Sequence, residues 1–173
     1  ENLVEQVKDG DDLVLDGSTG EVMVNPDAAV RAEYETKRDV FLKEKKELEQ
    51  YIGKPSVTKD GVQVEIVANI GKPEDAEKVL QYDGEGVGLF RTEFLFMDRT
   101  SMPTEEEQFE AYKKVAIAMN GKPVIIRTLD IGGDKEIPYM GLEKDENPFL
   151  GYRAIRFCLD RKEDIYKPQL RAL

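Results

Sequence analysis

The stretch that decides the predicted fold is Val124-Ile125-Ile126-Arg127-Thr128-Leu129-Asp130. It begins with consecutive apolar residues, which is typical of a strand buried on both faces within a parallel sheet. Gly121 and Pro123 precede the stretch and end any helix before it. A parallel strand requires a crossover, usually a helix, on the way to the next strand. The stretch therefore predicts a fold in which strands and helices alternate.

Two further strands are predicted upstream, each followed by a helix. Residues 61–69 and 86–90 are rich in apolar and β-branched side chains. A helix that opens at Pro73 follows the first strand, and one that opens at Pro103 follows the second. Three such units in about 110 residues match the roughly 30 residues per unit of a (β/α)8 barrel. We therefore predict an α/β fold with an incomplete (β/α)8 (TIM) barrel, because the chain ends before a barrel can close.

The predicted helices carry local signals of their own. Thr104 and Glu107 have the spacing of a capping box at the start of the second helix. The predicted apolar face of this helix consists of Phe109, Tyr112, Val115, Ala116 and Met119. After the third strand we expect a helix that begins at Asn147 or Pro148 and runs towards residue 161. A last helix is expected to follow it and to reach the end of the chain.

The N-terminal part has a different pattern. Residues 13–15 and 21–25 flank the turn Gly17-Ser18-Thr19-Gly20, which predicts a β-hairpin. A lone hairpin is marginal in water, so we expect it to belong to a larger sheet with strands before Glu1. Residues 28–52 contain no glycine or proline and are rich in charge, which favours a solvated connector helix over a coiled coil. The predicted domains are residues 1–27, 28–54 and 55–173.

Composition limits the classes of partner. The net charge of −11 argues against a nucleic-acid or anionic-membrane surface, because the long-range field repels both. The sequence has no apolar run of about 18 residues and no signal peptide, so we expect a cytoplasmic protein without membrane insertion. The single cysteine, Cys158, stands in an apolar run and is expected to fill core space.

Two arginines stand where predicted strands run into loops. Arg91 follows Gly88-Leu89-Phe90, and Arg127 follows Val124-Ile125-Ile126. Binding residues of a β/α barrel lie at this end of the strands. A guanidinium group matches carboxylate and phosphate oxygens, so the arginine pair, Arg91 and Arg127, is expected to bind a small polyanion. The structural alternative is that each pairs with a carboxylate, Glu93 for Arg91 and Asp130 or Asp134 for Arg127.

Other residues are further candidates for the same anion site. Lys135 follows Gly132-Gly133-Asp134, where adjacent glycines allow backbone N–H groups to turn towards an anion. Arg153 and Arg156 are one helical turn apart near the predicted start of a helix, and Arg153 is the stronger candidate. Asn69, in the first predicted strand, is also a candidate substrate-binding residue.

Four motifs resemble one family. They are Gly86-Val-Gly-Leu-Phe-Arg-Thr-Glu-Phe-Leu-Phe-Met, Pro103-Thr-Glu-Glu-Glu-Gln-Phe, Arg127-Thr-Leu-Asp-Ile-Gly-Gly-Asp-Lys and Asn147-Pro-Phe-Leu-Gly-Tyr-Arg-Ala-Ile-Arg. They are similar to Enzyme I of the bacterial phosphoenolpyruvate-dependent sugar phosphotransferase system. The resemblance implies that residues 1–27 end a phosphohistidine domain, that residues 28–54 connect, and that residues 55–173 begin a phosphoenolpyruvate-binding barrel.

The resemblance also implies an activity. In that family phosphoenolpyruvate passes its phosphoryl group to an enzyme histidine with the help of Mg²⁺, and then to the carrier protein HPr. Arg91, Arg127 and Arg153 are substrate-binding residues by this resemblance, and a homodimer is expected at full length. The acceptor histidine, the Mg²⁺ ligands and the family's cysteine acid are expected outside this chain, and Cys158 does not match that cysteine. The chain alone is therefore expected to be inactive.

Two other interpretations stay open at this stage. The Arg91-Thr92-Glu93 element also occurs in pyruvate phosphate dikinases and phosphoenolpyruvate synthases, which would require an ATP-grasp domain upstream. In the third interpretation, the chain is a non-catalytic barrel fragment that acts as a binding or dimerisation module.

Overall fold

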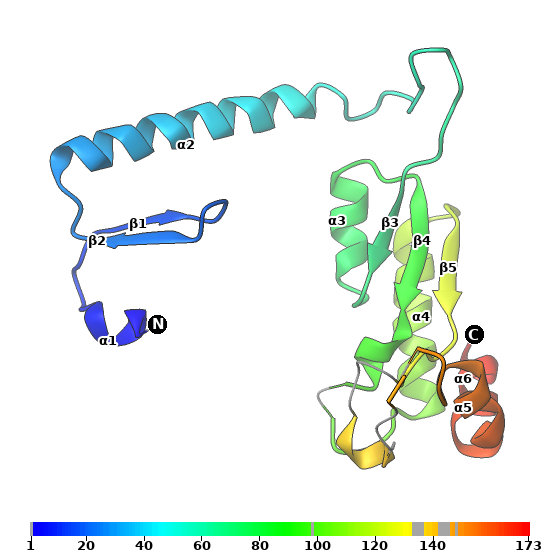
Figure 1. Cartoon of the computed structure of the whole chain (residues 1–173). Coiled ribbons are helices and arrows are strands. Elements are labelled where there is room, and N and C mark those ends of the chain that lie inside the picture. The colour runs from blue at the N-terminus through cyan, green and yellow to red at the C-terminus, as the bar shows by residue number, and fades with distance from the viewer. Residues whose placement is uncertain (1, 98, 133–136, 142–145, 148) are drawn as a thin grey trace. The chain divides into compact units, whose positions relative to one another are not determined.

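A computed structural model describes residues 2–97, 99–132, 137–141, 146–147 and 149–173. Two compact units divide the chain, Glu1–Ile52 and Gly53–Leu173. Each unit has its own elements, shown in Figure 1.

The first unit contains a hairpin and a long helix. After the short helix α1 (Leu3–Gln6), strands β1 (Leu13–Asp16) and β2 (Glu21–Val24) pair antiparallel, which confirms the predicted hairpin. Helix α2 (Ala28–Glu49) is capped by Asp27, whose side chain accepts a hydrogen bond from the backbone N–H of Val30. No residue of α2 is buried, so its predicted solvated character is confirmed.

The second unit contains a parallel sheet in the order β3-β4-β5. Its strands are β3 (Val67–Ile70), β4 (Gly86–Arg91) and β5 (Val124–Arg127). Helix α3 (Asp75–Gln81) connects β3 to β4, and helix α4 (Glu105–Met119) connects β4 to β5. The strand arrows point the same way in Figure 1. The α/β class with a parallel sheet is confirmed, and its assignment to an incomplete (β/α)8 barrel stays a prediction.

Two predictions about these strands are wrong. The first strand begins at Val67 and not at residue 61, because the preceding residues form a separate turn. In that turn Val64 N–H donates to Ser56 O over 2.9 Å, and Gly61 N–H donates to Thr58 O over 3.0 Å. Strand β5 was predicted to be buried on both faces, but Ile125 is 60% exposed because β5 borders the described sheet.

Helix α4 begins with the predicted capping box. Thr104 Oγ1 accepts from the backbone N–H of Glu107, and the Glu107 carboxylate accepts from the backbone N–H of Thr104. The buried face of the helix consists of Gln108, Tyr112, Val115 and Met119. Phe109 and Ala116 were predicted on this face but are exposed, since at 3.6 residues per turn they lie about 70–90° from the centre of the buried face.

The predicted helix from Asn147 or Pro148 is also wrong. Pro148 lies outside the described residues, and the helix in this region, α5, spans only Ile155–Asp160. Ala154 has φ 50° and ψ −125°, which no helix accommodates, and its N–H donates to Ile131 O over 3.1 Å. After α5 come a π-helical turn, η3 (Lys162–Tyr166), and helix α6 (Lys167–Ala172), which confirms the expected C-terminal helix.

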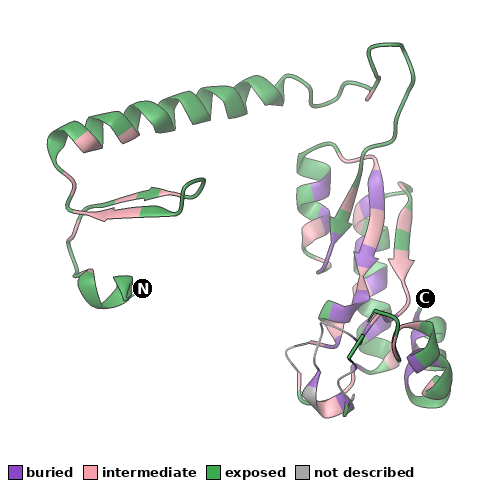
Figure 2. Cartoon of the chain, in the orientation of Figure 1, coloured by how far each residue is buried: buried purple, intermediate pink, exposed green. Residues whose placement is uncertain are grey.

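Two hydrophobic clusters support the second unit. One packs the sheet against α3 and α4, and the other lies among the loops beyond the strands and α5. Figure 2 shows buried residues gathered in β4, in α4 and near the C-terminal helices. Cys158 belongs to the second cluster and is fully buried, which confirms its predicted role in the core. Burial raises the pKa of its thiol to about 11.

Candidate anion-binding site

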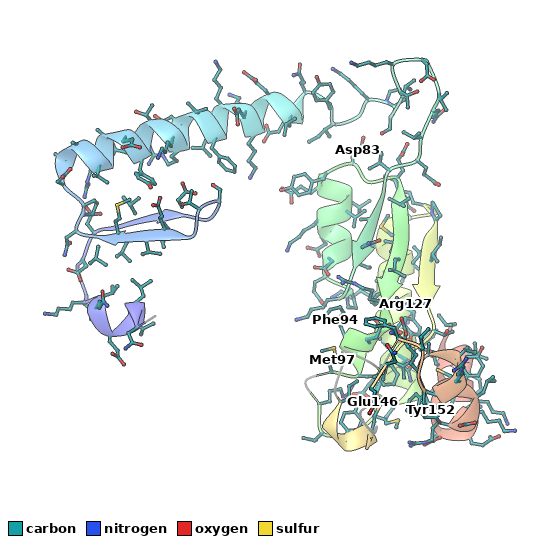
Figure 3. The ribbon with its side chains drawn as sticks, in the orientation of Figure 1. Asp83, Phe94, Met97, Arg127, Glu146 and Tyr152 are labelled. Carbon is teal, nitrogen blue, oxygen red and sulfur yellow. The ribbon has the colours of Figure 1, made fainter. Side chains whose placement is uncertain are left out.

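The arginine pair lies on neighbouring strands. Arg91 ends β4 and Arg127 ends β5, and the two residues are partners in the parallel register. Because parallel strands end at the same edge of a sheet, both side chains start from that edge. Figure 3 shows Arg127 and Phe94 at the end to which the strand arrows point, and Asp83 at the opposite end.

Two carboxylates fix the Arg127 guanidinium. Its Nη2 lies 2.6 Å from Oε1 of Glu93, and its Nη1 lies 3.1 Å from Oδ2 of Asp130. Glu93 follows β4 in the 3₁₀ turn η1 (Thr92–Leu95), and its side chain is fully buried. The same Oε1 atom accepts a hydrogen bond of 3.2 Å from the backbone N–H of Asp130. The structural alternative in which Arg127 pairs with Asp130 is thus realised, and Asp134 lies outside the described residues.

Arg91 is held in a different way. Its guanidinium lies over the ring of Phe94, 5.0 Å from the centroid, which is a cation–π distance. The Nε atoms of Arg91 and Arg127 are both buried and make no hydrogen bond within the described part of the chain. A buried donor without an acceptor is costly, and a charged one more so. Two such donors at neighbouring strand ends favour an anionic ligand.

Arg153 joins the group through Asp130. Its Nη2 and Nε lie 2.8 Å and 3.2 Å from Oδ1 of Asp130, and its guanidinium lies 4.9 Å from the ring centre of Phe149. Asp130 therefore bridges Arg127 and Arg153. Arg156 points elsewhere, since its Nη1 donates to the backbone oxygens of Leu150 and Gly151 over 3.3 Å and 3.4 Å.

A glycine makes the approach of Arg153 feasible. Gly132 has φ +116°, a backbone conformation that residues with a Cβ atom rarely adopt. A Cβ atom at this position would lie 2.6 Å from Cβ of Arg153 and 3.1 Å from the oxygen of Tyr152. From the sequence, Gly132 is a candidate for backbone anion binding, and in the structure its lack of a side chain allows this close packing.

The other two candidates are not placed with the arginines. Lys135 lies outside the described residues. Asn69 is exposed on β3, where it lines a groove of about 380 Å³ together with Asp75, Lys78 and Val79. Among the residues described, no hydrogen bond or ion pair links Asn69 to Arg91, Arg127 or Arg153. Its substrate-binding role stays a prediction.

A buried polar network, which no sequence pattern predicts, lies behind the arginines. Thr92 Oγ1 donates to Arg127 O over 2.9 Å, and Gln169 Nε2 donates to Thr92 Oγ1 over 3.3 Å. The amide oxygen of Gln169 accepts from Leu129 N–H over 2.8 Å. A glutamine in a polar C-terminal segment gives no sequence signal of burial, because this residue type is mostly exposed.

The site carries net positive charge. Three arginines face two carboxylates, so the formal sum is 3 − 2 = +1, within a chain whose net charge is −11. The described residues contain no group of three or more acidic, cysteine or histidine side chains that would hold a metal. Glu93 and Asp130 are engaged with arginines, so they do not fit a Mg²⁺ site. No described helix is both long and apolar enough to cross a membrane.

The parallel sheet with its connecting helices defines an α/β domain of the class whose ligand sites lie at the carboxyl ends of the strands. Residues 45–173 match the family described as "PEP-utilising enzyme, PEP-binding domain". The chain belongs to this family of phosphoenolpyruvate-utilising enzymes.

Three similar relatives share one name, phosphoenolpyruvate-protein phosphotransferase. The protein of Staphylococcus carnosus (strain TM300) is 58% identical over 172 residues, which cover 99% of this chain and 30% of the relative. That of Staphylococcus epidermidis is 54% identical with the same coverage. That of Bacillus sp. (strain S) is 52% identical over 168 residues, 97% of this chain and 29% of the relative. These names confirm the resemblance to Enzyme I, and the chain spans about a third of each relative.

Proposed function

We propose that this chain supplies the phosphoenolpyruvate-binding part of a phosphoenolpyruvate-protein phosphotransferase. The observation that carries the proposal is the pair of buried Nε donors of Arg91 and Arg127 at neighbouring strand ends. The names of the relatives support the phosphotransferase over a dikinase or synthase. In the proposed reaction the phosphoryl group passes to an enzyme histidine and then to the carrier protein HPr in sugar uptake.

The residues suit this chemistry. Phosphoryl transfer depends mainly on positioning the donor and on neutralising charge over the transferring oxygens. Phosphoenolpyruvate carries a carboxylate and a phosphate, and guanidinium groups form paired hydrogen bonds with both. Arg127 is held in place by Glu93 and Asp130, so it is ordered before a ligand arrives. Mg²⁺ would neutralise phosphoryl charge further, and we propose that its ligands and the acceptor histidine lie outside this chain.

The remaining proposals concern the whole protein. Residues 1–27 would end the phosphohistidine domain, and residues 55–173 would form the first part of the barrel. Residues 28–54 would be the connector helix between them. We also propose that the full protein is a cytoplasmic homodimer. Lys135 and Asn69 remain additional candidates for contact with phosphoenolpyruvate.

The test uses a hybrid protein, in which residues 1–173 replace the matching segment of the Staphylococcus carnosus relative. Transfer of phosphate from labelled phosphoenolpyruvate to HPr is measured. We expect Arg91→Ala and Arg127→Ala to abolish transfer, because each removes a guanidinium from the proposed substrate site. Arg171→Ala, which breaks a surface ion pair with Glu105, is the matched control and is expected to retain transfer. Near-normal transfer by both site variants would refute the proposal.

A further inference from the structure

We propose that Gln169 is a positioning residue that holds the two strand-end arginines at their working separation. It lies on α6, and its side chain joins the loops that follow β4 and β5. This inference rests on the proposed function, because it concerns how the phosphoenolpyruvate site is kept in shape. Gln169 itself need not touch the substrate.

The hydrogen bonds of Gln169 reach both loops. Its Oε1 accepts from the N–H of Leu129, two residues after Arg127. Its Nε2 donates to Oγ1 of Thr92, the residue after Arg91. The Thr92 hydroxyl then donates to the backbone oxygen of Arg127, so the two strand ends are tied to each other and to α6.

The side-chain amide of Gln169 acts as both a hydrogen-bond donor and an acceptor. Nε2 also donates to the hydroxyl of Tyr112 over 3.1 Å, so both N–H groups and the oxygen have partners. Gln169 and Thr92 are each 0% exposed, and Tyr112 is 4% exposed. Because these side chains are buried, water does not replace a lost hydrogen bond. A donor or acceptor that loses its partner therefore lowers the stability of the fold. A leucine at this position leaves the Leu129 N–H without its acceptor, and we expect the loop to shift to recover one.

The chain offers a matched control in Gln108. This glutamine is 2% exposed, donates to the backbone oxygen of Pro103 over 3.3 Å and accepts from the Tyr112 hydroxyl over 3.2 Å. It belongs to the same buried polar cluster as Gln169, but among the described residues no hydrogen bond links it to Thr92, Arg127 or Leu129. Replacing it by leucine removes similar interactions without loosening the arginine pair.

The experiment compares Gln169→Leu and Gln108→Leu in the hybrid protein. Thermal unfolding reports stability, and steady-state phosphorylation of HPr gives KM for phosphoenolpyruvate and kcat separately. We expect both variants to lower Tm, but only Gln169→Leu to raise KM, by about tenfold. A uniform loss of ground-state and transition-state binding raises KM and leaves kcat near its original value. Equal KM changes in the two variants, or an unchanged KM in Gln169→Leu, would overturn the proposal.

Two variants at Thr92 test whether its hydroxyl group carries the link between Gln169 and Arg127. Thr92→Ser keeps the hydroxyl that links Gln169 to Arg127 O, whereas Thr92→Val removes it at similar volume. We expect Thr92→Ser to stay within about twofold of the parent KM and Thr92→Val to raise it as Gln169→Leu does. A raised KM in Thr92→Ser equal to that of Thr92→Val would count against the hydrogen-bonded link. If Arg127→Ala also left KM and transfer unchanged, the failure would belong to the proposed function and not to Gln169.

Discussion

The carboxylate of Glu93 lies 2.6 Å from the guanidinium of Arg127, although the two residues belong to different strand-helix units. Glu93 is fully buried, while about a third of the Arg127 side chain is exposed. The ion pair therefore joins the turn after β4 to the end of β5 from the inside.

Replacement of Glu93 by glutamine is expected to lower the free energy of unfolding by about 1–3 kcal/mol. The neutral amide keeps the shape of the side chain but leaves Arg127 without one of its two charge partners. Urea denaturation measures the loss. Glu105→Gln, which breaks the surface ion pair with Arg171, serves as the control and should change stability by less than about 0.5 kcal/mol. Similar losses of unfolding free energy in the two variants would contradict a stabilising role for the buried Glu93–Arg127 ion pair.

Substitution of Gly132 by alanine is expected to weaken phosphoenolpyruvate binding. The added Cβ would meet Cβ of Arg153 at 2.6 Å, so the segment that carries Arg153 must move away from Asp130. Gly121→Ala is the control, because Gly121 also has positive φ, at +88°, but no atom lies within 4 Å of the added Cβ. Both variants carry backbone strain of about 1 kcal/mol. Only Gly132→Ala should raise the KM for phosphoenolpyruvate in the hybrid protein, and an equal rise in Gly121→Ala would count against this role.

The sequence predicted those parts of the fold and site that depend on local signals. The hairpin, the long helix after Asp27, the capping box at Thr104 and two of the three strands follow from turns, caps and apolar runs. The placement of Arg91 and Arg127 on neighbouring strand ends also follows, because both stand directly after apolar runs in successive units.

Long-range contacts escaped prediction. Gln169 bonds to Leu129 and Thr92, which are 40 and 77 residues away, and no local pattern marks such a partner. Arg153 was expected within a helix, but it precedes α5 and pairs with Asp130, which is 23 residues away in the sequence. The next residue, Ala154, has a positive φ, which a regular helix does not contain. The error at residue 61 has a local cause. Residues before Val67 form a compact turn, although their composition favours a strand.

The thiol of Cys158 is expected to resist alkylation in the native protein. It is fully buried and donates to the backbone oxygen of Leu129, and burial raises its pKa to about 11. The reactive thiolate is then about 10⁻⁴ of the total at neutral pH, before access is considered. Iodoacetamide labelling followed by mass spectrometry measures the rate in native and urea-unfolded protein. Ser101→Cys in a Cys158→Ala background gives the exposed control, and equally fast labelling of native Cys158 would disprove its burial.

The same thiol predicts an alkaline effect on stability. Because its folded pKa is raised, its contribution is fully present below the ordinary value of 9.0 and is lost as pH rises towards about 11. Cys158→Ala removes this titration. The difference in unfolding free energy between parent and variant should therefore narrow between pH 9 and pH 11. A constant difference across that range would be inconsistent with a buried neutral thiol.

The capping box of α4 predicts an acid effect of opposite direction. The backbone N–H of Thr104, and then the Arg99 guanidinium, lower the pKa of Glu107 below its ordinary value of 4.5. A carboxylate with a lowered pKa stabilises the fold above that ordinary value, and the contribution is lost as pH falls through the folded pKa. Thr104→Ala removes the reciprocal cap and should cost about 1 kcal/mol at neutral pH, whereas Thr100→Ala, an exposed control, should not.

Glu107→Gln should lower the urea midpoint at neutral pH and lose its effect once Glu107 is protonated in the parent. If the Glu107→Gln deficit persisted undiminished in acid, the charged form of Glu107 would not be what stabilises the start of α4.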